Sequence, residues 1–444
     1  MERLTPKDAA ILGLEDDVSA AHGLTIGVFD GPEPDHDALV ERVADRIRLV
    51  PRYRQRLLTV PLDLERPVWV DDPNFQIDFH VRHTALPKRT GRNAFSAFVS
   101  RSLSQRLDRG KPLWELWIVS GLPKGQWALV SKVHYAIVDG VSGTDLLGLL
   151  ADSIEVDDTI GRRMPAPLPD TRQLLTDAAI DLAFDPMETF RTARSVVNRP
   201  LRLARHLSRS LTDVRDPDSL GRARGPHRRW QSAKIPLDGI RAVRTDHGCT
   251  TTDVILAAVA SGIRNYLLAN GKPVPRSVRV LVPLSVGAAS GGLSGQIATL
   301  EGELPIAEAD PGERLRMIHE QTSPGAAARG AIAGQVLRRQ EDFVAPTIMG
   351  QGVRSTMLDI RDRRAVDTVA INVPGPVHTI EILGHRMVET YPAIPLPGRV
   401  QVAMAAISLG DTVYFGITSD WDTTEGLRHA ASGVTDTLAD LNDA

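Results

Sequence analysis

The sequence contains one cysteine, Cys249, and no apolar run long enough to cross a membrane. A single cysteine cannot form an intrachain disulfide, which is typical of a protein from a reducing compartment. The apolar stretches fall short of the ~18 uninterrupted residues that a spanning helix requires. The first residues, MERLTPKDAAILGLEDD, also lack the basic region and apolar segment of a signal peptide. These absences predict a cytoplasmic protein whose contact with a membrane is peripheral.

Lysine is scarce as well, with seven residues, so arginine supplies most of the positive charge. Lys and Arg together number 52 against 55 Asp and Glu, which gives a net charge of -3. This balance excludes a nucleic-acid-binding protein that relies on bulk positive charge. The sequence also shows no cluster of metal-ligating residues and no glycine-rich phosphate-binding loop. We therefore predict no metal site, no bound cofactor and no nucleic-acid partner.

Length and composition fit a globular protein with a core of normal size. The 444 residues are 42% hydrophobic and 24% charged, which excludes a disordered or fibrous chain. At ~150 residues per domain, this length corresponds to two or three domains. Apolar spacing predicts a helix over residues 36–50. Alternating residues 399–407 and 412–417 around Gly410-Asp411 predict a β-hairpin near the end of the chain.

The middle of the chain differs in composition from both ends. Residues 156–232 include the proline-rich MPAPLPD and the basic tract RTARSVVNRPLRLARHLSRS. Arginines alternate there with Val and Leu, as in a basic amphipathic helix that lies on anionic lipid. Pro200 interrupts the pattern, and a helical connector between two domains explains it equally well. The predicted organisation is an N-terminal unit over 1–155, a connector over 156–232 and a C-terminal unit over 233–444.

The sharpest local feature is the run HYAIVDG at residues 134–140. A predicted strand over residues 127–134 ends at His134, and a turn with Asp139 and Gly140 follows. A histidine in such a turn can act as a general base, and the glycine permits unusual backbone angles. A histidine at the end of a strand is also common as a structural residue. The run alone leaves both roles open.

Two further motifs lie far apart in the sequence. The tetrapeptide KPLW, which ends at Trp114, precedes the strand that leads to His134. The run NVPGP, with Asn372, Pro374 and Gly375, follows a predicted strand and must turn sharply. It could be a rigid loop that presents a polar side chain, or a Pro/Gly turn without function.

Taken together, these residues resemble the wax ester synthase/diacylglycerol acyltransferase family of bacteria. The resemblance spans nearly the whole chain and rests on several motifs in the family's order. They are LTPKDAAIL, PRYRQRL, KPLWELWIVSGL, GPHRR, TTDVILAAVASGIRNYL, ADPGERLRMIH and INVPGP.

The resemblance implies an α/β (α+β) fold of chloramphenicol-acetyltransferase-like architecture, with two subdomains and an active-site channel between the halves. It also implies transfer of a fatty acyl group from long-chain acyl-CoA, as co-substrate, to an alcohol. The acceptor would be diacylglycerol, which gives triacylglycerol, or a long-chain fatty alcohol, which gives a wax ester. Such apolar substrates imply peripheral contact with the inner membrane face or with lipid droplets.

The family's motif His-His-x-x-x-Asp-Gly falls on His134, Tyr135, Asp139 and Gly140. In the family the second histidine removes the hydroxyl proton, while the aspartate is chiefly structural. The resemblance further implies that Asn372, Pro374, Gly375, Asp253 and Trp114 line the channel for acyl-CoA and substrate.

The sequence departs from the family at the base, because Tyr135 replaces the second histidine. A tyrosine with a pKa of about 10 is a poor base at neutral pH. Adjacent side chains on a strand point to opposite faces, so His134 could serve only if the backbone were distorted. Three functions stay open: an acyltransferase with an adapted base, a weak or inactive homologue that binds acyl-CoA or lipid, and an acyltransferase with another acceptor.

Overall fold

The computed structural model describes most of the two halves of the chain. The described residues are 2–61, 65–87, 91–137, 146–154, 166–170, 172–174, 176, 220, 225–286, 296–322, 353–354, 356–358, 366–373, 375–376, 379–398, 400–422 and 426–443. Asp139, Gly140, Pro374 and most of the predicted connector lie outside them. Among the helices within these ranges, none is both long and apolar enough to cross a membrane.

The N-terminal half is built on a six-stranded sheet that has a helix packed on each face. Its strand order is β12-β13-β2-β7-β6-β5. The helix α2 (His36–Arg46) packs on one face and α3 (Gly91–Ser104) on the other. The strands are β2 (His22–Phe29), β5 (Val81–Ala85), β6 (Trp114–Ser120), β7 (Trp127–His134), β12 (Glu381–Ile382) and β13 (His385–Ala393).

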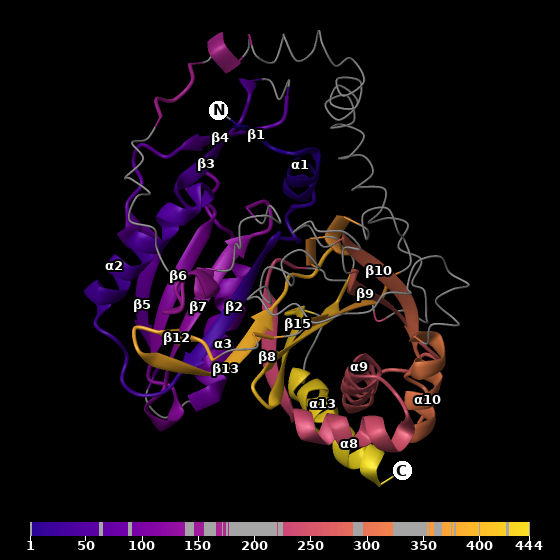
Figure 1. The fold of residues 1–444 in the computed structure, drawn as a ribbon. Coiled ribbons are helices and arrows are strands. Elements are labelled where there is room, and N and C mark those ends of the chain that lie inside the picture. Colours follow the sequence, from indigo (N-terminus) through magenta and orange to yellow (C-terminus); the bar gives the residue numbers. More distant parts are fainter. Residues whose placement is uncertain are drawn as a thin grey trace.

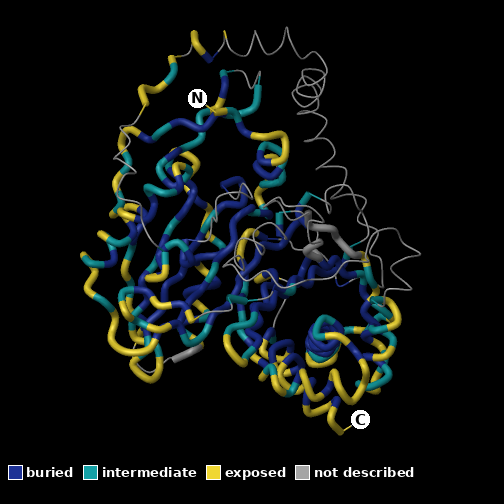
Figure 2. The backbone as a smooth tube through the Cα atoms, in the orientation of Figure 1, coloured by how far each residue is buried: buried dark blue, intermediate teal, exposed yellow. Residues whose placement is uncertain are grey.

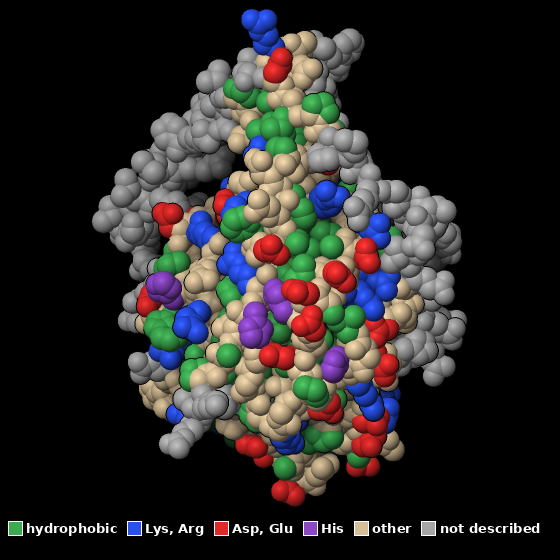
Figure 3. All heavy atoms as spheres, turned by 90° about the vertical axis from the view of Figure 1, so that its left-hand side faces the viewer, with side chains coloured by type: hydrophobic (Ala, Val, Ile, Leu, Met, Phe, Trp, Pro, Cys, Tyr) green, Lys and Arg blue, Asp and Glu red, His purple; other side chains and the backbone are tan. Residues whose placement is uncertain are grey.

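Among the described residues, the face of this half shown in Figure 3 carries no extended area of one charge. Acidic, basic and histidine side chains occur together on the face shown in Figure 3, with hydrophobic side chains between them. This mixture agrees with the near-neutral net charge of the whole chain.

A small antiparallel sheet and a short helix lie above the N-terminal sheet (Figure 1). The small sheet has the order β1-β4-β3, with β1 (Glu2–Arg3), β3 (Gln55–Leu58) and β4 (Val68–Asp71). The helix α1 (Pro6–Leu12) follows β1, and the hydroxyl of Thr5 caps its start by accepting the Asp8 N–H. The segment after α1 leads directly into β2 and contributes to the site described below.

The C-terminal half has a second six-stranded sheet, which helices cover on one face (Figure 1). Its strand order is β10-β9-β11-β14-β15-β8. The strands are β8 (Arg228–Pro236), β9 (Val278–Val286), β10 (Gln296–Leu304), β11 (Thr368–Val373), β14 (Val402–Leu409) and β15 (Thr412–Asp420). The covering helices are α8 (Leu237–His247), α9 (Thr251–Ala269), α10 (Pro311–Thr322) and α13 (Leu427–Asn442).

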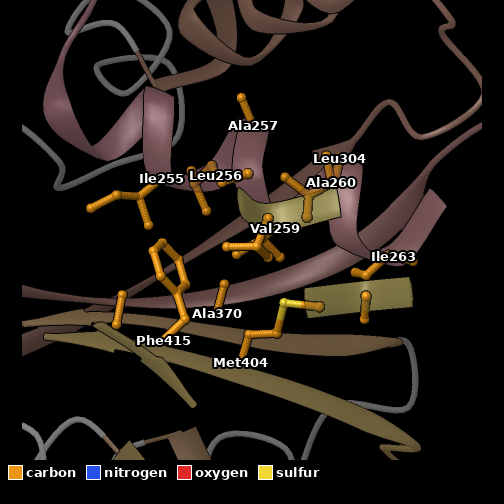
Figure 4. Packing of buried hydrophobic residues seen from close by; sticks show 14 of the residues in the cluster. Ile255, Leu256, Ala257, Val259, Ala260, Ile263, Leu304, Ala370, Met404 and Phe415 are labelled. Atoms are coloured by element: carbon orange, nitrogen blue, oxygen red, sulfur yellow. The ribbon is translucent and has the colours of Figure 1, made fainter. Parts of the chain in front are cut away.

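The helix α9 forms the centre of the C-terminal core. Its Ile255, Val259 and Ile263 side chains point toward Met404 and Phe415 of the sheet (Figure 4). Small residues on α9 let neighbouring elements approach closely, and a Cβ on Gly262 would lie 2.9 Å from the Ala430 carbonyl oxygen of α13. The strong apolar pattern of this segment is therefore explained by burial on all sides of residues 253–263.

The C-terminal part of the chain donates a strand to the N-terminal sheet. The strand β13 comes from the C-terminal part of the chain, yet it pairs antiparallel with β2 and extends the N-terminal sheet. It also packs against β14 and β15 of the other sheet. At this crossing a Cβ on Gly416 would lie 1.6 Å from the carbonyl oxygen of Pro392, so only glycine fits there. The N-terminal sheet is thus completed by strands from the C-terminal part of the chain.

A second junction joins α3 to β8, the edge strand of the C-terminal sheet. The Trp230 N–H donates to the Ser100 hydroxyl at 2.9 Å, and the Arg228 N–H donates to the Ser104 hydroxyl at 2.8 Å. Residues four apart on a helix are ~6 Å apart along its axis, close to the ~6.6 Å between residues two apart on a strand. The spacing of the two serines on α3 therefore fits the spacing of the two outward-facing N–H groups of β8. The backbone is buried where the halves meet and exposed on the outer helices and loops (Figure 2).

Candidate active site

His134 is the last residue of β7 and stands opposite His22 of β2 in the sheet register. Its backbone N–H donates to the Leu113 carbonyl at 3.1 Å, and the next N–H, of Tyr135, donates to the Ala21 carbonyl at 2.9 Å. The chain then turns, with the Ile137 N–H returning to the His134 carbonyl at 3.0 Å. The strand thus ends at the motif, as the sequence predicts.

Both ring nitrogens of His134 face protein groups. The Ala136 N–H donates to Nδ1 at 3.0 Å, so Nδ1 carries a lone pair and the neutral ring holds its proton on Nε2. Nε2 lies 3.3 Å from Oε1 of Glu15, close enough for an ion pair but without the alignment of a full hydrogen bond. The side chain is only 2% exposed. The ring is therefore held in place, and neither nitrogen is presented as a free base.

Glu15, in the segment between α1 and β2, holds this arrangement together. Its carboxylate accepts the Ala21 N–H at 2.8 Å and a hydrogen bond from the Arg109 guanidinium, besides facing His134. Burial alone would raise the pKa of Glu15, but His134, the Ala21 N–H and Arg109 outweigh it and hold the pKa well below its ordinary range. Nothing in the local sequence distinguishes Glu15 from its acidic neighbours, so its role is visible only in the structure.

Two more buried polar side chains lie beside His134 on the face that α3 covers. His22 Nε2 donates to the Leu103 carbonyl at 2.9 Å, and Lys132 Nζ donates to the Gln105 carbonyl. Leu103 lies in the last turn of α3 and Gln105 directly follows the helix, where the helix dipole favours positive groups. Lys132 is fully buried, and this burial lowers its pKa to about 8. Burial and the charge of Lys132 hold the pKa of His22 well below its ordinary value.

Tyr135 lies on the other side of the strand. Its phenolic oxygen occupies the space over Gly23, whose neighbour His22 faces His134. Since successive residues of β2 point to opposite faces, Tyr135 and His134 diverge as expected. Burial raises the pKa of the Tyr135 hydroxyl far above its ordinary value, so this group holds its proton at neutral pH. Tyr135 therefore cannot replace the histidine as a base.

Two of the predicted channel residues of the C-terminal half, Asp253 and Gly375, have clear structural roles. Asp253 is fully buried in the first turn of α9, where it accepts the Thr250 N–H at 2.8 Å, His319 Nδ1–H at 2.8 Å and the Thr322 hydroxyl at 2.5 Å. These partners all belong to the C-terminal half. Gly375 allows the chain to pass β14, because a Cβ there would lie 1.3 Å from the Ser408 carbonyl oxygen.

Asn372 and Trp114 have different surroundings. Asn372 is half-buried in β11 and borders a narrow apolar recess that is too tight to hold a water molecule. The recess lies between α9 and the sheet. Trp114 is fully buried, stacks on His80 with ring centroids 4.6 Å apart, and donates from Nε1 to the Tyr53 carbonyl at 2.8 Å. Its observed role is packing, and contact with substrate stays a prediction for all these residues.

Comparison with known proteins identifies both halves. Residues 4–255 match the model of the wax ester synthase/diacylglycerol acyltransferase catalytic domain, and residues 294–442 match the corresponding C-terminal domain. A Mycobacterium tuberculosis protein that carries the name diacylglycerol O-acyltransferase tgs1 is 31% identical over 99% of this chain and 96% of its own length. A Mycobacterium bovis protein with a diacylglycerol O-acyltransferase name matches with the same identity and coverage.

Solved structures give the same answer for the fold. A wax ester synthase/diacylglycerol acyltransferase from Marinobacter aquaeolei VT8 is 25% identical, with a TM-score of 0.67 over 99% of this chain and 98% of that one. The first condensation domain of the CDA synthetase is 14% identical, with a TM-score of 0.54 over 100% of this chain and 98% of that one. The predicted two-subdomain architecture is confirmed. The chain belongs to the wax ester synthase/diacylglycerol acyltransferase family.

Proposed function

We propose that the protein is an acyl-CoA-dependent O-acyltransferase whose acceptor is diacylglycerol or a long-chain alcohol. The observation that carries this proposal is the match to both family domains over residues 4–255 and 294–442. The described start of the motif turn, residues 134–137, is also held by backbone hydrogen bonds and by the Glu15 carboxylate beside His134. Acyl-CoA enters as a co-substrate, and no bound cofactor or metal takes part.

In this reaction the acceptor hydroxyl oxygen attacks the thioester carbonyl carbon, the C–S bond breaks, and CoA leaves as the thiol with the proton of the hydroxyl. General acid–base catalysis of such a proton transfer contributes typically 10²–10⁴-fold. Tyr135 stands at the family's base position with a pKa raised by burial, so it supplies none of this factor. Transfer would then depend on holding the two substrates in register, with His134 and Glu15 keeping the turn rigid.

A second function is favoured by the same residues. The Tyr135 hydroxyl retains its proton, and both nitrogens of His134 face groups of the protein. A chain of this family without an available base could bind acyl-CoA or lipid and transfer little or nothing. This second candidate differs from the first in turnover and not in binding.

The decisive experiment measures acyl transfer by the purified full chain from palmitoyl-CoA to diacylglycerol or hexadecanol. We expect slow transfer by the wild type, little change in Tyr135→Phe, and a gain on the order of 10²-fold or more in Tyr135→His. His134→Ala should lose activity because the turn is no longer fixed. If neither the wild type nor Tyr135→His transfers palmitate to either acceptor, while palmitoyl-CoA still binds, the second candidate holds.

Both acceptors are apolar, so we expect the protein to meet them at a lipid surface or in the channel that the family resemblance implies. We propose peripheral contact with a membrane or a lipid droplet. Flotation of the full chain with anionic and neutral vesicles tests this contact. Recovery with anionic vesicles at low salt is expected, and absence of the protein from both vesicle fractions would contradict it.

A further inference from the structure

We propose that Arg228 is a positioning residue for the acyl-transfer site, because it fixes the segment that carries Glu15 and so keeps Glu15 against His134. Arg228 belongs to the GPHRR motif, which the proposed function leaves without a role. The activity part of this inference rests on the proposed function, and its structural part does not.

Arg228 is the first residue of β8 and one of the most buried arginines of the described chain, with a side chain that is 4% exposed. Nη1 donates to the carbonyls of Gly225 at 2.6 Å and His227 at 3.0 Å, and lies 3.5 Å from Oδ1 of Asp420 at the end of β15. These three partners belong to the C-terminal half. Nη2 donates across the junction to the carbonyl of Val18 in the N-terminal half.

The segment that Arg228 reaches is stiff. Oδ1 of Asp16 accepts the N–H groups of Val18 at 3.0 Å and Ser19 at 2.7 Å, and the Asp16 N–H donates to the Ser19 carbonyl at 3.1 Å. Asp16 directly follows Glu15. Three hydrogen bonds hold this turn as one rigid unit. The hydrogen bond from Arg228 to Val18 therefore also fixes the backbone of Glu15, which directly precedes the turn.

The other end of the connection is equally fixed. The Arg228 N–H donates to the Ser104 hydroxyl, and the Gly225 N–H lies 3.4 Å from Oδ1 of Asp420. A Cβ on Gly225 would lie 2.1 Å from a carboxylate oxygen of Asp422, which explains the glycine of the motif. The motif therefore forms a rigid connection between the end of β15 and the loop beside His134.

Only arginine can make all these contacts at once. The planar guanidinium has five N–H donors in a fixed fork, whereas a lysine ammonium is a single point charge. The adjacent Arg229 has the same chemistry but another position. Its guanidinium lies 4.1 Å from the ring centre of the exposed Trp421, and its Nε donates to the Trp421 carbonyl at 3.4 Å, all within the C-terminal half. Arg229 is thus a matched control.

The test compares Arg228→Lys and Arg228→Met with Arg229→Lys and Arg229→Met. The first readout is kcat and KM for palmitoyl-CoA at saturating acceptor. Misplacement by about 1 Å can cost on the order of 10²-fold in rate, so we expect such a loss of kcat in Arg228→Lys with KM nearly unchanged. Both Arg229 variants should behave as the wild type.

The second readout needs no turnover. The ring nitrogen signals of His134, assigned by their loss in His134→Gln, are recorded by NMR on histidine-labelled protein. In Arg228→Lys they should move toward those of Glu15→Gln, while in Arg229→Lys they should stay at the wild-type positions. If Arg228→Met does not fold, Arg228→Lys retains the buried positive charge and decides the question.

Folded Arg228→Lys with wild-type His134 signals would overturn the proposal, whatever its activity. Loss of kcat with unchanged signals would do the same, since Arg228 would then act by another route. A wild type without turnover would defeat the proposed function, yet a shift of the His134 signals in Arg228→Lys would still support the connection to Glu15. The two failures are therefore distinguishable.

Discussion

The phenolic oxygen of Tyr135 lies where any residue larger than glycine at position 23 would place its side chain. A Cβ on Gly23 would be 2.2 Å from this oxygen and 2.9 Å from the ring carbon that bears it. The two residues meet across the junction of β2 and the motif turn. The tyrosine at the family's base position is thus accommodated by a glycine on the neighbouring strand, so the two positions must be considered together.

Gly23→Ala should destabilise the protein by about 1–3 kcal/mol, the usual cost of forcing extra volume into a packed interior. The same change in a Tyr135→Ala background should cost much less, because the colliding ring is absent. Urea unfolding of the wild type, the two single variants and the double variant gives the coupling free energy, which we expect to exceed about 1 kcal/mol. Gly302→Ala is a matched control, since its nearest neighbour atom would be 3.6 Å from the new Cβ. Additive costs at positions 23 and 135 would contradict the packing relationship.

Three serines of α3 give a sharp test of the junction with β8. Ser100→Ala or Ser104→Ala removes the acceptor of a strand N–H, which should cost about 1–3 kcal/mol each. Ser102, on the same helix, is as buried as Ser100, but its hydroxyl has no hydrogen-bond partner, so Ser102→Ala should cost little or nothing. Urea unfolding monitored by tryptophan fluorescence compares the three variants. Equal costs for all three would show that the serines do not hold the strand.

Glu15→Gln should lower stability at neutral pH and lose its effect in acid. The pKa of Glu15 is lowered in the folded state, so its contribution is full above the unfolded value of about 4.5 and decreases as pH falls below it. We expect a deficit of about 2 kcal/mol at pH 7, typical of hydrogen bonds to a charged group. Unfolding free energies at pH 7, 5, 4 and 3 measure it. A deficit that stayed constant down to pH 3 would argue against an ionised Glu15.

Lys132 should make the free energy of unfolding rise with pH in the alkaline range, whereas a lysine in an ordinary ion pair would make it fall. Its folded pKa is about 8 against an ordinary 10.5, so between these values the unfolded chain holds the proton that the folded chain has lost. Stability of the wild type should therefore rise across this range, by up to about 3 kcal/mol. Lys132→Met lacks the titrating group, and its unfolding free energy measured from pH 7 to 10 should not show this rise. Parallel curves for the two proteins would refute the buried ammonium.

Local patterns predicted much of the fold. The predicted helix over 36–50 forms as α2, which ends at Arg46, and a 3₁₀ turn at Ile47–Leu49 follows because Pro51 disfavours helical geometry just before it. The predicted hairpin forms as β14 and β15, with Gly410 at a positive φ of 57°. These elements depend on neighbours in the sequence, and the sequence records such neighbours directly.

The missed features all depend on partners distant in the sequence. Glu15 meets His134, Ser100 meets Trp230, and β13 joins β2. No periodicity or motif encodes such pairs, since each residue is ordinary in its own segment. The apolar environment of Tyr135 was similarly invisible. The sequence showed that Tyr135 replaces a histidine, but it gave no sign that Gly23 makes room for the tyrosine ring.

The donated strand β13 has a consequence for synthesis on the ribosome. Once the first third of the chain has folded, β2 is paired with β7 on one side, but its other edge is still uncovered. The strand that covers this edge, β13, emerges about 250 residues after β7. At ~5–20 residues per second this edge stays open for on the order of 10–50 s. An open strand edge is a template for pairing with other chains. Newly made N-terminal halves must therefore be shielded from one another until the last part of the chain arrives.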